Sequence, residues 1–282
     1  MRIITWNLGR RRRQANEKAW AYLCNVLHAD IALLQEAAAP SDSRIGHLAL
    51  HLLHGDWGTG VYARTLALRQ VSVPFDPNRL VVCEVSILAV GPVYLVSLHA
   101  PTTNADPVEW CHRALDHLDG LVREHPAIVG GDLNASRTAE QWWPGAGNGP
   151  LFDRIDAGPL FDCHHKFNRE EEQTYFGSTK VPIQDDHIFV TKPLADLVTK
   201  CNAVDNEEMR SVSDHIPIVA DIAVAAAEIG EGERAPGAGV LRQLRWRLSS
   251  RVARRGECLE RRLARHCNMV TQRRVTMPPP KD

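Results

Sequence analysis

The chain has 282 residues, 44% of them hydrophobic, which is enough to bury a core in one large domain or in one domain with an appendage. Its sequence contains neither an apolar run long enough to span a membrane nor a secretion signal, and its seven scattered cysteines form no CxxC pairs. The net charge of −1 conceals an asymmetry: Arg234 to Arg274 contains twelve arginines and two glutamates, whereas the remainder has 21 basic and 32 acidic residues. We therefore expect a cytoplasmic monomer with reduced thiols, in which an acidic body is joined to a basic tail.

The first third of the chain is predicted to alternate buried strands with one helix. Residues 2–6 cluster β-branched side chains, as a short buried strand does. Apolar residues between 19 and 27 recur at helical spacing, and residues 30–34 form a second apolar run that leads into Gln35 and Glu36. Further strands are predicted at 58–74, which resembles a hairpin pair, and at 79–90 and 92–98.

The middle of the chain carries the clearest helix signal. Asp106 is a candidate N-cap, followed by Pro107 at the first helical position and Glu109 three residues after the cap. Residues 127–131 predict a strand that ends in a glycine turn directly before Asp132, and later strands are predicted at about 186–191, 194–204 and 216–224. Many strands with few helices favour an α/β architecture of two packed sheets flanked by helices over a doubly wound sheet.

The composition changes after Asp221, which predicts a domain boundary. We assign residues 1–224 to a catalytic domain, 225–239 to a linker rich in Ala, Gly and Glu, and 240–282 to an Arg-rich tail that is partly helical or disordered. The tail has three interpretations: docking on its own acidic domain, binding nucleic-acid phosphates, or lying on an anionic membrane. Intramolecular docking or disorder is our default.

Six polar clusters share one position, at or beside the end of a predicted buried strand. Apolar strands that end in carboxylate, amide and imidazole groups build a site at a sheet edge. The clusters are Thr5-Trp6-Asn7, Gln35-Glu36, Ser97-Leu98-His99, Gly131-Asp132-Leu133-Asn134, Asp185-Asp186-His187 and Ser213-Asp214-His215.

These side chains suit phosphodiester hydrolysis, which requires a hard cation, a base for the attacking water and a proton source. Glu36, Asn7 and Asp214 can supply the oxygen ligands that Mg²⁺ prefers. His99 and His215 can donate to a phosphate or move protons. Asp186 can hold an imidazole in one tautomer, as the third member of a catalytic triad does.

In this order the clusters resemble the endonuclease/exonuclease/phosphatase superfamily, which includes deoxyribonuclease I, exonuclease III-type abasic-site endonucleases and neutral sphingomyelinases. Gly131-Asp132-Leu133-Asn134 is similar to the family's GDxN signature, and the segment from Ser213 to Pro217 is similar to its terminal SDHxP signature. The resemblance covers residues 1–223 and is strengthened by TWN, QE, LHA and the Asp before the apolar strand at 187–190.

The resemblance implies a four-layer α/β/β/α sandwich that cleaves phosphate esters with Mg²⁺ or Mn²⁺. It also implies a role for each matched residue: Glu36 is the main metal ligand with Asn7 and Asp214 nearby; Asp132 orients or deprotonates water; Asn134 binds phosphate; His215, paired with Asp186, contacts the scissile phosphate; and His99 assists leaving-group protonation.

The chain departs from the DNA-repair branch of this family at two places. Gly9 stands where some members carry an acid two residues after the first Asn, and only Arg79 and Glu84 are candidates for a further site residue in the central strands. Both departures weigh against an abasic-site activity in particular.

Each motif also has a structural interpretation, since an Asp or Asn at a strand end is ordinarily a turn or cap residue. Convergence of all six favours a shared site. His47, His51 and His54 have helical ligand spacing but no nearby acid, so an exposed helix or strand face is favoured. Two features each have two interpretations. Arginines 10–13 form either a solvated loop or a phosphate-binding loop. Trp142-Trp143 either stacks on a base or sugar or serves as core packing or a lid.

We therefore expect a metal-dependent phosphodiesterase, most simply a nuclease with nucleic acid as substrate. The first alternative is a phosphatase or phosphodiesterase acting on a small or lipid phosphoester. The second is a catalytically silent phosphate-binding module, against which the retention of every central motif argues.

Overall fold

A computed structural model describes residues 1–10, 13–103, 105–177 and 181–224. The chain divides into two compact units, Met1–Glu228 and Ile229–Asp282, and all described residues belong to the first. The expected linker and Arg-rich tail, together with Arg11 and Arg12, therefore lie outside the described residues.

The first sheet contains six strands in the order β11-β12-β1-β2-β4-β3. It is mixed, because β1 and β2 pair in parallel whereas all its other neighbouring strands pair antiparallel. The strands are β1 (Arg2–Asn7), β2 (Ile31–Ala38), β3 (His47–His54), β4 (Trp57–Ala63), β11 (Val198–Ala203) and β12 (Ile218–Ile222).

The second sheet also has six strands, in the order β5-β6-β7-β8-β10-β9. Its one parallel pair is β7 with β8. The strands are β5 (Arg69–Val71), β6 (Leu80–Ile87), β7 (Gly91–His99), β8 (Ala127–Asp132), β9 (Leu160–Asp162) and β10 (Asp186–Thr191).

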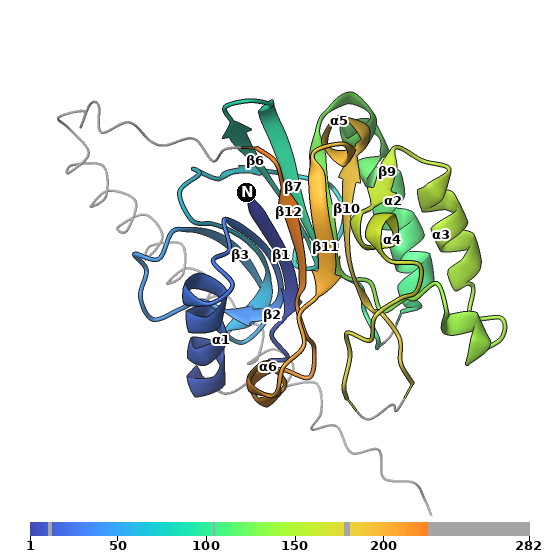
Figure 1. Cartoon of the computed structure of the whole chain (residues 1–282), viewed down its shortest axis with the longest axis horizontal. Helices are drawn as coiled ribbons and strands as arrows, with labels where there is room; N and C mark the ends of the chain where they lie inside the picture. Colours follow the sequence, from blue (N-terminus) through green and yellow to red (C-terminus); the bar gives the residue numbers. More distant parts are fainter. Residues whose placement is uncertain (11–12, 104, 178–180, 225–282) are drawn as a thin grey trace, which may run out of the picture. The chain divides into compact units, whose positions relative to one another are not determined.

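Helices flank the two sheets on their outer sides (Figure 1). Asp106 caps the longest helix as expected, since its carboxylate accepts hydrogen bonds from the backbone amides of Val108 and Glu109. The helices are α1 (Arg13–Asn25), α2 (Pro107–Glu124), the 3₁₀ helix η1 (Ala139–Gln141), α3 (Asn148–Asp156), α4 (Cys163–Phe167), α5 (Lys192–Ala195) and α6 (Glu207–Val212).

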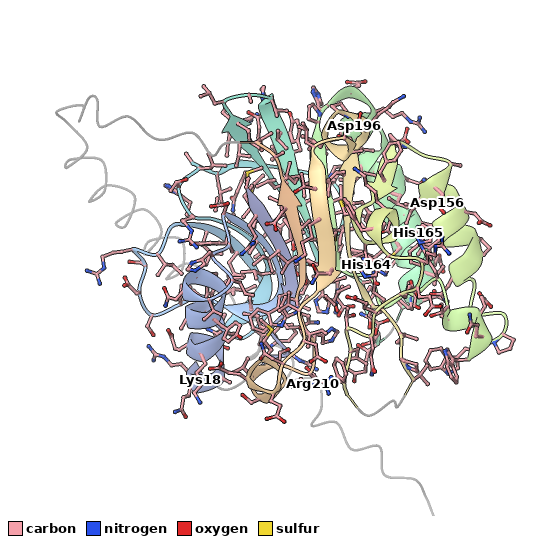
Figure 2. All side chains as sticks on the ribbon, in the orientation of Figure 1. Lys18, Asp156, His164, His165, Asp196 and Arg210 are labelled. Carbon is pink, nitrogen blue, oxygen red and sulfur yellow. The ribbon has the colours of Figure 1, made fainter. Side chains whose placement is uncertain are left out.

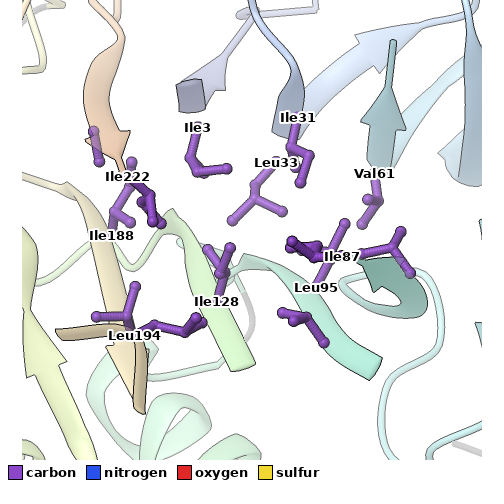
Figure 3. Packing of buried hydrophobic residues seen from close by; sticks show 14 of the residues in the cluster. Ile3, Ile31, Leu33, Val61, Ile87, Leu95, Ile128, Ile188, Leu194 and Ile222 are labelled. Carbon is purple, nitrogen blue, oxygen red and sulfur yellow. The ribbon is translucent and has the colours of Figure 1, made fainter. Parts of the chain in front are cut away.

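Three apolar clusters hold these layers together. The first lies between the sheets, where Ile3 and Leu33 face Leu95 and Ile128 (Figure 3). The second joins α2 and α3 to the second sheet, and the third joins α1 and α6 to the first sheet. This arrangement is the α/β/β/α sandwich that the sequence predicts, because each inner strand presents apolar residues to both of its faces.

Several local predictions were wrong. The hairpin expected at 58–74 is instead β3 with β4, and the next strand, β5, joins the other sheet. Residues 47–54 form a strand because Leu48, Leu50 and Leu52 alternate with smaller and polar residues, a period of two. The strand expected at 194–204 begins only at Val198, since Pro193 starts the short helix α5. The helices α3, α4 and α6 were not predicted.

The parallel pairs create the edge at which the polar clusters meet. In β1 and β2 the register places Asn7 beside Gln35, so both strands end at the same edge of the first sheet. Helix α6 lies at this end of the sandwich, where Figure 2 shows Arg210, and Asp196 marks the opposite end. In the described part of the chain, no helix is both long and apolar enough to cross a membrane.

Candidate active site

Strand register brings three predicted site residues into one row of the second sheet. Asp132 at the end of β8 lies opposite His99 of parallel β7 and opposite Asp186 of antiparallel β10. Neighbours in register point to the same face of a sheet, so an imidazole and two carboxylates lie side by side. Asp186 is fully buried, and Asp132 is 2% exposed.

Asp132 also connects the two sheets. Its Oδ2 accepts a 2.7 Å hydrogen bond from Nδ2 of Asn7, which ends β1 in the first sheet. The amide oxygen of Asn7 accepts from the backbone N–H of Gly9, which fixes the amide's orientation. The predicted metal-ligand residue Asn7 and the predicted base Asp132 are therefore direct partners.

The turn after β8 requires its glycine and its asparagine. Gly131 has φ +149°, and a Cβ there would lie 1.9 Å from the carbonyl oxygen of Leu98, so no other residue fits. Asn134 adopts the left-handed region with φ +48°, its backbone N–H donates to Oδ1 of Asp132, and its Nδ2 donates to the carbonyl of Ala100. The GDxN turn thus fixes Oδ1 of Asp132, and Asn7 of β1 fixes Oδ2.

His215 stands between two carboxylates. Its Nδ1 is 2.8 Å from Oδ2 of Asp186, and its Nε2 is 3.9 Å from Oδ2 of Asp132. Burial alone would lower the pKa of His215, but Asp186 and then Asp132 outweigh burial and raise this pKa to about 10. At neutral pH His215 is therefore an imidazolium with Nδ1–H donated to Asp186. The sequence predicted the pairing of these two residues but not the charge on the ring.

The segment before β12 is fixed against β1. Nε1 of Trp6 donates to the carbonyl of His215, and Oγ of Ser213 donates to the carbonyl of Asn7. The same Oγ accepts from the backbone N–H of His215. Asp214 is half-buried between these residues, and its backbone carbonyl accepts a hydrogen bond from Phe176.

Glu36 lies at an irregularity of β2. The pairing of β2 with β4 shifts register between Leu34 and Ala37, and Glu36 itself has φ +48°. Its Oε2 is 3.1 Å from Nε of Arg10, and its Oε1 is 3.7 Å from Nε2 of His99. A β-bulge aims a side chain away from the regular alternation of the strand, and here it turns Glu36 toward His99.

Glu36 and Asp132 are buried carboxylates that lie close to other carboxylates. Burial raises the pKa of Glu36, Arg10 opposes this effect, and the carboxylates of Asp132 and Asp214 reinforce it. Burial also raises the pKa of Asp132, with His215 opposing and Asp186 reinforcing the shift. Each carboxylate is thus held among others, in an environment with a shortage of positive charge.

His99 has the opposite titration behaviour to His215. Burial lowers its pKa to about 4, against the raising effect of Asp132, so the ring is neutral at neutral pH. Its contact with Glu36 is consequently not an ion pair there. Arg79 donates from Nη1 to the carbonyl of His99, and its charge also acts on His99.

The donor set fits a divalent cation. The carboxylates of Glu36 and Asp214 and the amide oxygen of Asn7 are hard oxygen ligands. Burial first, and then the neighbouring acids, raise the pKa of Glu36, and an added positive charge would oppose this effect. No group of three or more His, Cys, Asp or Glu side chains in the described residues is arranged to hold a metal ion by itself. Mg²⁺ usually keeps several waters and needs one or two carboxylates, so this finding does not conflict with the fit.

Three site residues were missed or given no role from the sequence. Asp185 is 6% exposed and its pKa is raised to about 8, by burial first and by Asp132 second. Tyr175 packs its ring 4.9 Å from the ring of His215, and no motif pointed to it. Gln35 is fully buried and donates to Ser97 across the two sheets, a role that its place beside Glu36 could have suggested.

Other candidates lie away from the site. The ring of His187 is fully buried and contacts Gln184 and the carbonyl of Ala135, so it supports the turn. Glu84 pairs with Arg69 on the outer strands, whereas Arg79 is the candidate that reaches the site. His51 binds the carbonyl of Pro77, in agreement with a surface role.

The comparisons with known proteins agree with this geometry. The model of the Endonuclease/Exonuclease/phosphatase family matches residues 4–215. No curated protein sequence matches the chain.

Similar solved structures include three nucleases. The 3'-5' exonuclease NExo from Neisseria meningitidis has a TM-score of 0.63 and 18% identity, covering 79% of this chain and 99% of that chain. An AP endonuclease from Archaeoglobus fulgidus has a TM-score of 0.59 and 19% identity, covering 79% and 100%. The endonuclease domain of TRAS1, a telomere-specific non-LTR retrotransposon, has a TM-score of 0.58 and 22% identity, covering 79% and 98%. At these identities the likeness shows a shared fold.

Proposed function

The chain belongs to the Endonuclease/Exonuclease/phosphatase family, and from this premise we propose that it is a divalent-metal-dependent phosphodiesterase that cleaves nucleic acid. The observation that carries the proposal is the position of His215 between Asp186 and Asp132. A buried imidazolium beside a buried carboxylate is costly to fold, and such perturbed pairs cluster at functional sites, which supports a functional role for this pair.

Asp132 is the proposed general base. Its raised pKa brings it closer to the working pH, where a base is most effective. Hydrogen bonds from Asn7 and from the backbone of Asn134 fix its two oxygens, so an attacking water would meet a carboxylate of set orientation. Asn134 retains one amide hydrogen for a phosphate oxygen, since its hydrogen bond to the carbonyl of Ala100 occupies the other.

His215 is the proposed electrostatic partner of the phosphate. Its charge is held by Asp186, and Nε2 lies beyond hydrogen-bonding distance of Asp132. Nε2–H can therefore donate to an oxygen on which negative charge develops. His99, neutral at neutral pH, stays a candidate for protonating the leaving oxygen.

The proposed cation, Mg²⁺ or Mn²⁺, would be held by Glu36 with Asn7 and Asp214. When bound, it supplies positive charge that neutralises the phosphate oxygens and the leaving group. Arg10, 57% exposed at its side chain, is positioned to exchange its contact with Glu36 for one with a phosphate.

A nucleic-acid substrate is supported by the arginines at the site. Arg10 and Arg79 both act on Glu36 or its neighbours, and guanidinium groups bind phosphate through paired hydrogen bonds. Each of the three similar solved structures is a nuclease or an endonuclease domain. The net charge of −11 outside Arg234–Arg274 favours a second candidate, a phosphodiesterase for a small phosphoester, because an acidic body repels a polyanion.

We also propose a reducing compartment such as the cytoplasm and a monomeric state. The five cysteines in the described ranges are free thiols, and Cys83, Cys111, Cys163 and Cys201 are buried. Burial raises the pKa of each of these four thiols, which keeps them unreactive.

The test is product release from plasmid DNA, structured RNA and a simple phosphodiester, each with Mg²⁺, with Mn²⁺ and with EDTA. Asp132→Asn should abolish turnover, and Asp119→Asn, an exposed carboxylate on α2 paired with Arg123, is the matched control. Thermal melting of both variants checks that the fold is kept.

The outcomes separate the candidates. Metal-dependent cleavage of either polymer, lost only in Asp132→Asn, supports a nuclease and identifies its substrate. Turnover of the simple ester alone moves the substrate to small phosphodiesters. Silence on all three substrates contradicts the proposal and favours a phosphate-binding module. Full activity of Asp132→Asn contradicts the role given to Asp132.

A further inference from the structure

A cavity of about 280 Å³ opens beside the GDxN turn. It is lined by Asn134 of the turn, by Asp185, by the indole-bearing residue Trp143, and by apolar residues that include Ile183 and Val108. Ligand pockets typically begin at about 300 Å³, so the cavity suits one ring system rather than a large molecule. It lies next to the phosphate-binding position proposed for Asn134.

Asp185 is the unusual residue in this cavity. It is 6% exposed and lines the cavity, and its backbone N–H and C=O are bonded to Thr174 and Leu133. A carboxyl group in a cavity wall can accept a hydrogen bond from a molecule that enters the cavity. Burial also keeps the pKa of this carboxyl high, so it can offer an O–H donor as well as an acceptor near neutral pH.

The other walls are built before any ligand arrives. The backbone N–H of Trp143 donates to the carbonyl of Ala139, and the carboxylate of Glu140 accepts from the backbone of Gly145 and Asn148. The amide oxygen of Asn148 in turn accepts from the backbone N–H of Ser136. These bonds fix the loop that carries Trp143, which is 42% exposed.

We propose that this cavity is a nucleobase subsite, in which Trp143 stacks on a base next to the scissile phosphate and Asp185 selects bases with an exocyclic amino group. The proposal rests on the proposed function for its link to cleavage. Trp142 and Trp143 were left open between stacking and packing in the sequence, and the cavity assigns stacking to Trp143. Trp142 lines a different cavity with Arg137 and His165.

The chemistry of the two walls explains the selection. An indole offers a flat surface on which any base can stack, a contact worth about 1–3 kcal/mol per base. A carboxyl group accepts from the amino group of adenine, cytosine or guanine, as acidic side chains accept from cytosine N4. Thymine and uracil lack that amino group, so they leave the acceptor unpaired.

The test uses pools of single-stranded DNA and RNA of random sequence. The protein digests each pool, and the product ends are sequenced. One nucleotide that flanks the cut should show about tenfold fewer thymines or uracils than the starting pool, the ratio that about 1.4 kcal/mol of discrimination gives. Asp185→Leu should abolish this bias, whereas Asp185→Asn should keep it, because an amide also presents one acceptor and one donor. The bias is a ratio, so a general loss of rate in either variant does not alter it.

A second comparison tests Trp143. Defined oligonucleotides carry either a base or a tetrahydrofuran abasic analogue at the biased position. Trp143→Ala should slow cleavage of the base-containing strand about tenfold and leave the abasic strand within about twofold. Trp142→Ala, which removes the neighbouring exposed indole, is the matched control and should leave both rates unchanged.

Several results would overturn the subsite. They are an unbiased wild-type profile, a bias that survives Asp185→Leu, and an abasic strand that the wild-type protein cuts as fast as the base-containing one. The last result would assign the cavity to a bare sugar.

Loss of the proposed function can be told apart from loss of the subsite. If the wild-type protein cleaves no polymer, calorimetric binding of the four nucleoside monophosphates to Asp132→Asn protein decides the matter. Preference for amino-bearing bases that disappears in the Asp132→Asn/Asp185→Leu double variant would keep the subsite without the nuclease. Equal or absent binding of all four would exclude it.

Discussion

The two sides of the site differ in how far they are assembled. On the His215 side, Asn7, Asp132, Asp186 and His215 form a continuous chain of contacts, from the 2.7 Å bond of Asn7 to the 2.8 Å bond of Asp186. On the Glu36 side, the acid meets an exposed arginine, and Nδ1 of His99 has no hydrogen-bond partner among the described residues.

The difference shows which part of the site the protein can complete alone. On the His215 side one buried imidazolium lies between two buried carboxylates, so the protein itself compensates part of their charge. On the Glu36 side the positive charge comes from Arg10, whose side chain is more than half exposed. We therefore expect the His215 side to orient the reactants and the Glu36 side to bind the proposed cation.

The largest expected effect comes from breaking the His215 side. Asp186→Asn should lower kcat by about 10³–10⁴-fold, because an amide does not hold His215 as an imidazolium in one orientation. Steady-state kinetics on the best substrate from the cleavage screen measures this loss. Asp119→Asn should retain full activity, and a loss below about tenfold for Asp186→Asn would show that the pair is structural.

The next largest effect is on the Glu36 side. Glu36→Gln should weaken Mn²⁺ binding about 10–100-fold, since it removes one of the two proposed charged ligands and leaves Asp214 with the amide oxygen of Asn7. Calorimetric titration of Mn²⁺ into the protein without substrate measures the affinity. Glu84→Gln changes the same residue type outside the site and should bind Mn²⁺ like the wild type. Equal affinities for all three proteins would move the cation elsewhere.

A smaller effect concerns Asp185, which borders the His215 side. Its folded-state pKa of about 8 lies above that of an unfolded Asp, so the protonated acid stabilises the fold below about pH 4 and this stability is lost as pH rises through about 8. Asp185→Asn removes this loss, and we expect on the order of 2 kcal/mol more stability than the wild type above about pH 8. Urea unfolding of the wild type and of Asp185→Asn, at about pH 4 and again above about pH 8, measures the difference in stability between the two proteins. If this difference is the same at low and high pH, Asp185 is charged throughout.

The fold and the site differ in how far they could be predicted. The apolar runs of β1, β2, β7 and β8, each ending in a polar cluster, were sufficient to predict two sheets and an edge site, because buried strands are read from composition alone. Strand partners were harder to predict. The helical spacing of His47, His51 and His54 concealed the alternation of β3, which forms a local hairpin with β4, and nothing in residues 58–74 indicated that β5 joins the other sheet.

Within the candidate site, the sequence predicted that the motif residues lie together, but it did not predict their pKa values. His99 and His215 are the same residue type at similar strand ends, yet their pKa values move to about 4 and about 10. The difference comes from Asp186, which reaches His215 only through the pairing of β10 with β8. Asp185 belongs to one of the predicted clusters but was given no role, because only the structure places it in the wall of a cavity.

The smallest predicted effect tests whether Arg10 stands in for the cation. Arg10 lies 3.1 Å from Glu36 and also over the ring of Trp57, so its charge competes with a metal ion for the same carboxylate. Because the arginine is largely exposed, water screens this competition, and Arg10→Gln should tighten Mn²⁺ binding only about two- to fivefold. Arg10→Lys keeps the charge and the backbone strain at φ +48°, so its affinity should match the wild type. Calorimetric titration at low salt compares the three proteins, and added salt should reduce the difference between them. Weaker binding in Arg10→Gln would mean instead that Arg10 orders Glu36 for the metal, which would remove the contrast between the two sides of the site.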